Sequence, residues 1–390
     1  MPSSQTMRLS DVSEKCTQLS LTILDILKPW IECNSYSGNI EGVNAMGDLL
    51  VRDFSMDGLF ATRQPGKQVG DHLIFRTPGW ESAAASDRLL LVGHHDTVFP
   101  PGTFDVFELA GDTLRGPGVL DMKGGLATVY LALKSFSSLG ALSSIPLAFI
   151  CVGDEEIGSP DSSELLLELA RGIGGALVFE AGRAQDAVIT RRKGTGALRV
   201  SVRGRAAHAG NHHKEGVNAI CALAKLISGV ERFTDYDKGV TVNVGIIEGG
   251  SARNTVPEHA ECQIDFRLIH TEDGEELVQR VKALALEIAK ATNTEITVEG
   301  GVRRGPLTRT DASAELYTRY AAAAKATGLG HSEAGLIGGG SDASAVSAVG
   351  TPAIDGLGPR GKGFHTHDEY IEVSSLALRA EALVRFIVAW

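Results

Sequence analysis

Arg88-Leu89-Leu90-Leu91-Val92-Gly93-His94-His95-Asp96 is a mostly apolar run that ends in polar side chains. A second apolar run, residues 145–152, ends in Gly153-Asp154-Glu155-Glu156. Runs of this kind are typical of strands that are buried on both faces of a sheet. Residues 126–139 between them have a helical pattern, so the order strand, helix, strand predicts an α/β sheet. Because such sheets carry their sites at strand ends, the polar residues after each run are candidates for function.

The middle of the chain has a different order of elements. The patterns predict strands at residues 197–204, 240–247, 260–268 and 295–298, and helices at 216–230 and 277–288. This β-α-β-β-α-β order is that of a ferredoxin-like α+β unit. The α/β pattern then resumes, with helices expected near 312–325 and 375–389, besides one from Leu19 to a stop at Pro29. We therefore expect one domain of residues 1–192 and 303–390, interrupted by an inserted domain of residues 193–302.

The composition narrows the class of protein. The chain is 43% hydrophobic and 22% charged, and its net charge of −11 without a basic stripe argues against a nucleic-acid partner. Its five cysteines are widely spaced with no Cys-x-x-Cys, which indicates reduced thiols. Residues 1–15 show no signal-peptide pattern, and no stretch is apolar over the length of a bilayer. We expect a soluble, cytoplasmic protein with no membrane partner.

Several short segments contain side chains that bind zinc-like ions. Imidazole nitrogens and carboxylate oxygens are suitable ligands for a pair of such ions, with one carboxylate left over as a base. This combination predicts a hydrolase that works through a metal-bound water. The candidate residues are His94, Asp96, Asp121, Glu155, Glu156, Glu180 and His365.

Each candidate also has an ordinary interpretation. Asp121 follows Gly116-Pro117-Gly118 and could cap a helix, and the adjacent glutamates 155 and 156 could be solvated. His94 and Asp96 should point to the same side of their strand, which suits Asp96 to orienting the ring of His94. His95, His212, His213 and His367 remain ambiguous. No Gly-x-Ser-x-Gly is present, and the glycines around Asp121 do not have the spacing of a phosphate-binding loop.

As a set, over about residues 90–370, these segments resemble the dinuclear zinc exopeptidase and deacylase family. Its members include glutamate carboxypeptidase, aminoacylase, acetylornithine deacetylase and succinyl-diaminopimelate desuccinylase, and the likeness to glutamate carboxypeptidase is the greatest. The resemblance implies a catalytic domain with two Zn²⁺ ions per subunit, which Co²⁺ or Mn²⁺ could replace. It also implies an inserted lid domain through which two subunits form a homodimer.

The resemblance assigns roles to individual residues. Asp121 would bridge the two ions, with His94 and Glu180 completing one site and Glu156 and His365 the other. Glu155 would be the general base, Asp96 the orienting acid, and the bond from Asp121 to Met122 would be cis. In the lid, His208 would reach the neighbouring subunit's site and stabilise the oxyanion. The residues that would hold the substrate's carboxylate are Asn254, Arg267, Gly339 and Gly340, although Arg267 could equally be a strand-end ion-pair partner.

The reaction implied is hydrolysis of an amide bond next to a free carboxylate, in a short peptide or an N-acyl amino acid. Glutamate rather than aspartate at position 180 favours carboxypeptidases and deacylases. The arginine expected beside the proline at the lid's end is displaced in Arg303-Arg304-Gly305-Pro306, so the preferred side chain stays open. The alternatives are a biosynthetic deacylase of the acetylornithine or succinyl-diaminopimelate type and a metal-binding relative without catalysis.

Overall fold

The computed structural model describes residues 8–390, which divide into two compact units. Unit 1 comprises residues 8–191, 307–336 and 341–390, and unit 2 comprises Arg192–Pro306 and Ile337–Gly340. Unit 2 therefore extends past the expected end at residue 302 and includes Gly339 and Gly340, which were expected outside it. The unit extends past residue 302 because its last strand runs to Arg304. It includes residues 337–340 because the backbone N–H of Lys193 donates a hydrogen bond to the carbonyl of Ile337 at 2.8 Å.

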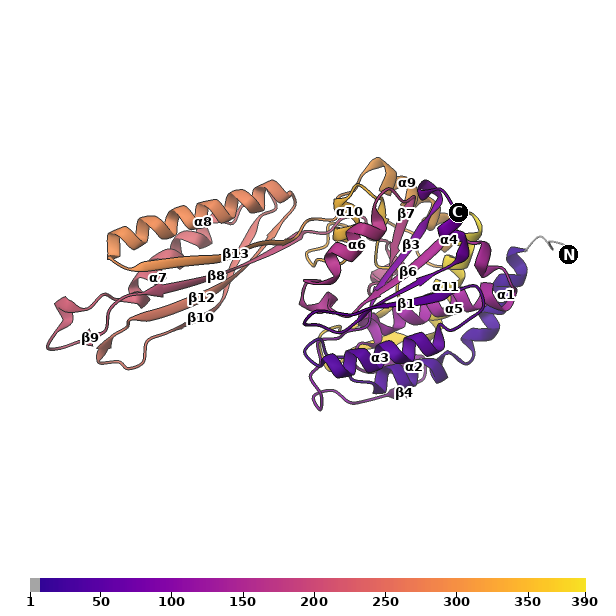
Figure 1. The fold of residues 1–390 in the computed structure, drawn as a ribbon, viewed down its shortest axis with the longest axis horizontal. Helices are drawn as coiled ribbons and strands as arrows, with labels where there is room; N and C mark the ends of the chain where they lie inside the picture. Colours follow the sequence, from indigo (N-terminus) through magenta and orange to yellow (C-terminus); the bar gives the residue numbers. More distant parts are fainter. Residues whose placement is uncertain (1–7) are drawn as a thin grey trace. The chain divides into compact units, whose positions relative to one another are not determined.

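Unit 1 is built around a mixed six-stranded sheet (Figure 1). Its strands, in spatial order, are β1 (Phe60–Gln64), β2 (His72–Arg76), β6 (Leu147–Val152), β3 (Leu89–His94), β7 (Gly175–Val178) and β14 (Ala353–Ile354). Strands β6, β3, β7 and β14 are parallel, whereas β1 and β2 are antiparallel to their neighbours. Every residue of β3 and β6 is buried, as expected from their apolar runs.

Helices flank this sheet. α5 (Gly124–Ser138) packs on α1 (Leu9–Ser20), α2 (Ile23–Glu32) and α11 (Val373–Val388), and α6 (Ser162–Ala170) packs on α10 (Ala343–Ala348). The remaining helices of the unit are α3 (Ile40–Asp53), α4 (Pro78–Ser82) and α9 (Asp311–Ala326). The expected stop at Pro29 was wrong, because Pro29 lies inside α2. The helix continues past it because the next two residues, Trp30 and Ile31, are buried in the core.

The topology gathers the candidate residues at one edge of the sheet. Strands β3, β6 and β7 run parallel, so their carboxyl ends lie side by side. His94 is the last residue of β3, Glu155 and Glu156 follow β6, and Glu180 follows β7. A four-stranded antiparallel sheet of β15 (Gly361–Lys362), β16 (Tyr370–Glu372), β5 (Thr113–Arg115) and β4 (Glu108–Ala110) then brings the His365 segment beside the loop that carries Asp121.

Unit 2 is an antiparallel sheet with two helices on one face. The strand order is β10 (Thr241–Gly249), β12 (His259–Leu268), β8 (Gly194–Arg203) and β13 (Glu295–Arg304), and the helices are α7 (Ala219–Val230) and α8 (Thr271–Thr292). The short strands β9 (Ala207–His208) and β11 (Thr255–Val256) pair at one end. Leu198, Val200 and Val202 of β8 alternate with more exposed residues and pack in a core with the helices. The α and β elements follow in the β-α-β-β-α-β order that the sequence predicts.

Within residues 8–390, no helix combines the length and the apolar character that a bilayer crossing requires.

Candidate metal centre

Asp121 lies at the centre of a cluster of imidazole and carboxylate groups in unit 1. Its Oδ1 atom is 3.2 Å from Nε2 of His94, and its Oδ2 atom is 3.2 Å from Nε2 of His365. The peptide bond between Asp121 and Met122 is cis, as the resemblance implies. The carboxylate therefore presents one oxygen to each of two groups of ligands.

The first group forms around His94. Its Nε2 atom also lies 3.8 Å from Oε1 of Glu180, and its Nδ1 atom faces the backbone carbonyl of Asp96 at 3.0 Å. Donation from Nδ1–H to that carbonyl leaves Nε2 as the nitrogen that can bind a metal. The ring of His94 is thus held with its ligand nitrogen toward Asp121 and Glu180.

The second group forms around His365. Its Nε2 atom lies 3.1 Å from Oε2 of Glu156 as well as 3.2 Å from Asp121. His367, the alternative ligand, instead stacks its ring on Phe104 at a centroid distance of 5.3 Å. The structure thus brings His365, and not His367, to the carboxylates.

Glu155 lies beside the first group. One of its carboxylate oxygens is within 4.8 Å of ligand atoms of both His94 and Glu180, and these groups are buried. A carboxylate at this distance can contact a water held between the two groups of ligands, either directly or after a small rotation.

Asp96 is entirely buried and connects the two strand ends. Its Oδ1 atom accepts a hydrogen bond from the backbone N–H of Glu155 at 3.1 Å, and its Oδ2 atom accepts one from the N–H of Glu156, also at 3.1 Å. The hydroxyl of Ser37 donates to Oδ2 at 2.7 Å, and Oδ1 is 3.4 Å from Nδ1 of His94. One carboxylate therefore positions His94 and the backbone of both glutamates.

The charges in the cluster strongly influence one another. Burial alone would lower the pKa of His94, but hydrogen bonds to Asp121 and Asp96 raise it well above its ordinary value. The hydrogen bonds of His365 to Asp121 and Glu156 raise its pKa to about 10. Burial, and then the charge of Asp121, raise the pKa of Glu156 to about 8 and that of Glu180 well above its ordinary value. Crowded carboxylates of this kind are stabilised by a bound cation.

The side chains present fit a pair of divalent ions. Two further carboxylates and two imidazoles surround the carboxylate of Asp121, and these are the ligand types that zinc accepts. Among the described residues, Oε1 of Glu156 is buried without a hydrogen-bond partner, which a ligand carboxylate next to an ion would explain. The cluster therefore has the ligand types and the close spacing of a metal site.

Two acidic residues outside this donor set have structural contacts that sequence reasoning missed. Asp154 accepts hydrogen bonds from the N–H groups of Asp161 and Ser162 at the start of α6. These backbone donors stabilise the charge of Asp154. Glu369 is entirely buried, and its carboxylate accepts the N–H groups of Gly118, Leu120 and Asp121. No local pattern separates such an acid from a solvated one.

His95 is not part of the cluster. It is buried, its Nδ1 atom lies 3.4 Å from Sγ of Cys151, and burial lowers its pKa to about 3. The ring is therefore neutral and lies buried next to Cys151 of β6.

In unit 2, His208 and Asn254 lie next to each other. His208 pairs with Thr255 across β9 and β11, and the N–H of Ala209 donates to the carbonyl of Asn254 at 2.9 Å. Nδ1 of His208 accepts the backbone N–H groups of Gly210 and Asn211, both at 3.1 Å. An imidazole whose Nδ1 accepts must carry its proton on Nε2, so the exposed ring offers a donor. His212 and His213, also exposed, follow in the same loop.

Arg267 lies at the other end of this sheet. It is in register with Thr195, whereas His259, eight positions earlier in β12, pairs with Arg203 near the end that carries His208. At about 3.4 Å per residue this separates the two ends by roughly 27 Å. The guanidinium forms a two-point ion pair with Asp265, at 2.8 and 2.9 Å, which is the ordinary role considered for it.

The glycine pair lies at the Arg267 end. A Cβ on Gly340 would be 3.3 Å from Cγ2 of Thr195, and the carbonyl of Gly339 accepts a hydrogen bond from Arg192 at 3.1 Å. The structure thus separates the four expected carboxylate-binding residues into Asn254 at one end of unit 2 and Arg267, Gly339 and Gly340 at the other.

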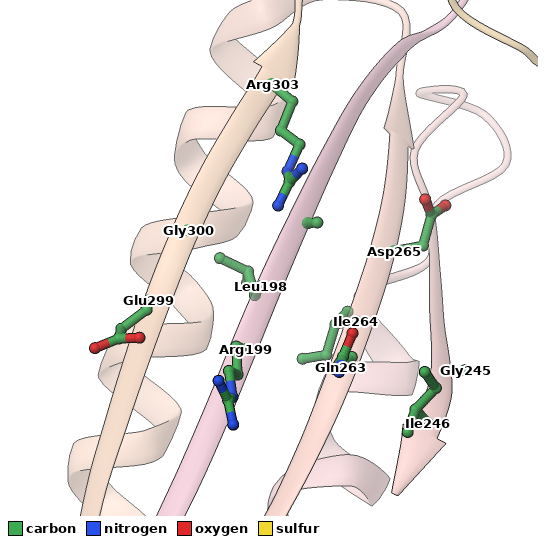
Figure 2. A pocket seen from close by; sticks show the side chains of 11 residues that line it. Leu198, Arg199, Gly245, Ile246, Gln263, Ile264, Asp265, Glu299, Gly300 and Arg303 are labelled. Carbon is green, nitrogen blue, oxygen red and sulfur yellow. The ribbon is translucent and has the colours of Figure 1, made fainter. Parts of the chain in front are cut away.

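A cavity of about 590 Å³ lies on the helix-free face of the unit 2 sheet (Figure 2). Asp265, the ion-pair partner of Arg267, is in its lining, together with Arg199, Gln263, Glu299 and Arg303. The lining carries two arginines and two acids, so its charge is balanced and favours no ionic ligand. None of the candidate metal ligands contributes to it.

Comparison with known proteins shows which family contains this chain. Residues 90–389 match peptidase family M20/M25/M40. The chain belongs to this family. It is 28% identical over 374 residues to carboxypeptidase G2 of Pseudomonas sp. (strain RS-16), an alignment that covers 94% of this chain and 88% of that one. It is 27% identical over 329 residues to acetylornithine deacetylase of Myxococcus xanthus, which covers 79% of this chain and 81% of that one.

Solved structures support the same fold. The crystal structure of a tripeptidase from Staphylococcus aureus subsp. aureus Mu50 matches with a TM-score of 0.77 at 23% identity, over 94% of this chain and 97% of that one. This M20/M25/M40 member is therefore a metallo-hydrolase that acts on amide bonds, with the α/β fold that the resemblance implies. Family membership also argues against the metal-binding relative without catalysis.

Proposed function

We propose that this protein hydrolyses an amide bond next to a free carboxylate, as a carboxypeptidase or an N-acyl-amino-acid deacylase. The observation that carries the proposal is the position of Asp121, whose two oxygens each face a separate histidine at 3.2 Å. This arrangement favours two Zn²⁺ ions per subunit, one with His94 and Glu180 and the other with Glu156 and His365. Co²⁺ and Mn²⁺ accept similar ligands and are substitutes to test.

Bound ions would polarise the scissile carbonyl and make a water molecule acidic enough to be deprotonated near neutral pH. Glu155 accepts the proton of the attacking water and later returns it to the leaving amine. Asp96 keeps Glu155 in place through the backbone N–H, so that the carboxylate stays close to His94 and Glu180. The carboxylates of Asp121, Glu156 and Glu180 are retained as anions once cations balance them.

His208 is suited to stabilising the oxyanion. Its Nδ1 atom accepts two backbone N–H groups, which leaves Nε2–H as a hydrogen-bond donor of fixed tautomer. Because His208 and Arg267 lie at opposite ends of one sheet, a substrate the size of a dipeptide cannot contact both in one subunit. We therefore propose that the partner subunit's His208 serves the site.

A homodimer through unit 2 follows from this assignment. Strand β10 is an edge of the sheet, and it exposes Ile246 and Ile247, of which 50% and 58% of the surface is accessible. An exposed edge with apolar side chains can pair with a second copy of the same strand. Asn254 would enter the neighbouring site together with His208, while Arg267, Gly339 and Gly340 would bind the substrate's carboxylate.

The test is the variant Glu155→Gln, assayed on N-acyl amino acids and on dipeptides. We expect the turnover number to fall by about 10²- to 10⁴-fold, the usual contribution of a general base, with both ions still bound. Glu164→Gln, the same chemical change at an exposed position of α6, should leave turnover unchanged. Unchanged turnover of Glu155→Gln with zinc bound would rule out this mechanism.

The identity to acetylornithine deacetylase favours a second candidate, a biosynthetic deacylase. The catalytic groups are the same in both candidates, so the substrate decides between them. A screen that includes N-acetylornithine and N-succinyl-diaminopimelate beside C-terminal dipeptides separates the two, because only one class should be turned over efficiently.

A further inference from the structure

The loop that carries Asp121 has an unusual hydrogen-bonding pattern. It connects β5 to α5, and Asp121 and Met122 have backbone angles outside the helical region, with φ of −121° and −131°. Its N–H groups at Gly118, Leu120 and Asp121 do not pair within a regular helix or strand. All three donate to a single side chain, the carboxylate of Glu369.

The geometry of this contact is close. Oε1 of Glu369 accepts the N–H of Leu120 at 2.7 Å and that of Asp121 at 3.0 Å, while Oε2 accepts the N–H of Gly118 at 3.1 Å. The side chain is fully buried, so water does not compete for these donors. The backbone of Glu369 adds a fourth contact, because its carbonyl accepts the N–H of Gly116 at 3.3 Å.

Glu369 also belongs to the segment that carries His365. The N–H of Glu369 donates to the carbonyl of Thr366 at 3.2 Å, and β16 begins at the next residue. The segment therefore delivers His365 to Oδ2 of Asp121, and four residues later it holds the backbone of Asp121 itself. The relative position of these two ligands depends on one buried carboxylate.

We infer that Glu369 is a positioning residue that aligns Asp121 between the two groups of metal ligands. Its carboxylate contacts the loop's backbone N–H groups, and it acts on Asp121 through them. The inference rests on the proposed dinuclear centre. It goes beyond that proposal because it assigns the position of the Asp121 carboxylate to a residue that is not itself a metal ligand.

The variant Glu369→Gln tests this inference. An amide has one acceptor oxygen, so its NH₂ group must face at least one of the loop's N–H donors, and the loop must shift. We expect the affinity for one or both ions to fall by about 10- to 100-fold, the usual effect of groups that orient metal ligands. We also expect the visible absorption of the Co²⁺-loaded protein, which reports coordination geometry, to change.

The control is Asp53→Asn. Asp53 accepts a hydrogen bond from Trp30 at 2.7 Å, its side chain is mostly buried, and it contacts no candidate ligand. Its loss should lower the urea midpoint of the metal-free protein without changing metal affinity or the Co²⁺ spectrum. This separates loss of positioning from general loss of stability.

If Glu369→Gln does not fold, Glu369→Asp replaces it, since aspartate keeps both acceptor oxygens but withdraws them by one methylene. In whichever variant folds, wild-type metal affinity together with a wild-type Co²⁺ spectrum would overturn the inference. If the wild-type protein itself does not bind two ions, the proposed metal centre fails instead, and the two failures are therefore distinguishable.

Discussion

Oδ2 of Asp121 lies 3.2 Å from Nε2 of His365, while the other oxygen of the same carboxylate faces His94 at the same distance. The two histidines come from distant parts of the chain, one from the end of β3 and the other from the segment before β16. Asp121 thus contacts both histidines, whereas Glu180 forms its ion-pair contact with His94 and Glu156 with His365.

This sharing predicts different results for two ligand variants. Asp121→Asn should lose both tightly bound ions, while Glu180→Gln should keep about one, because the His365 and Glu156 group stays intact. Metal content after exhaustive dialysis, measured by mass spectrometry, checks the difference. Retention of two ions by Asp121→Asn would show that Asp121 is not the bridge.

Asp96→Asn should reduce turnover without removing a ligand. The amide would place its NH₂ group against a buried N–H of Glu155 or Glu156, and an unpaired buried donor costs about 1–3 kcal/mol. We expect a lower urea midpoint and a fall in the turnover number that exceeds any rise in KM. Ser37→Ala, which removes only a hydroxyl that donates to Asp96, should have a smaller effect on both quantities. An equal effect of the two variants would argue against the role of Asp96.

Removal of the metal should make stability fall as the pH rises. In the metal-free protein the pKa of His365 is raised from 6.5 to about 10, so its stabilising contribution is complete below pH 6.5 and is lost as the pH rises through about 10. Burial and the charge of Asp121 raise the pKa of Glu156 from 4.5 to about 8. Deprotonation of Glu156 therefore also lowers the stability of the folded protein as the pH rises from 4.5 to about 8.

The measurement is the urea midpoint of the chelator-treated protein between about pH 6.5 and 10. We expect it to decrease over this window, and to decrease less in His365→Gln. The metal-loaded protein should not show the decrease, because ions favour the deprotonated ligands. A midpoint of the metal-free protein that stays constant or rises would contradict the charge coupling described for the cluster.

The assignment of His208 predicts complementation between two inactive variants. In a heterodimer of His208→Ala with Glu155→Gln, one site combines an intact Glu155 with the partner subunit's His208. If subunits exchange freely, half of the dimers in an equal mixture are mixed, and about a quarter of wild-type activity should return. Activity that stays at the level of the separate variants would indicate that His208 does not act across subunits.

The sequence predicts the centre of the unit 1 sheet because strands β3 and β6 are buried on both faces. Continuous apolar runs place β3 and β6, and in a parallel sheet their polar ends must meet, which brings His94 close to Glu155 and Glu156. Unit 2 was equally visible in the alternation of β8 and β12, where Leu198 and Ile264 are buried and Arg199 and Gln263 are exposed.

Other features depend on contacts that no local pattern encodes. Glu369 accepts a hydrogen bond from Asp121, which lies 248 positions earlier in the chain. Its neighbours in the sequence are those of an ordinary solvated acid. Pro29 indicates a helix end locally, but the burial of Trp30 and Ile31 keeps the helix going. The bounds of unit 2 differ from the predicted ones for a similar reason, because the backbone of Lys193 is hydrogen-bonded to that of Ile337, which lies far along the chain.

The central claim, that Asp121 bridges two ions, is tested most directly by diffraction from crystals of the zinc-loaded protein at the zinc absorption edge. We predict two anomalous peaks, one between Asp121, His94 and Glu180 and the other between Asp121, Glu156 and His365. A single peak, or peaks that do not contact Asp121, would contradict it.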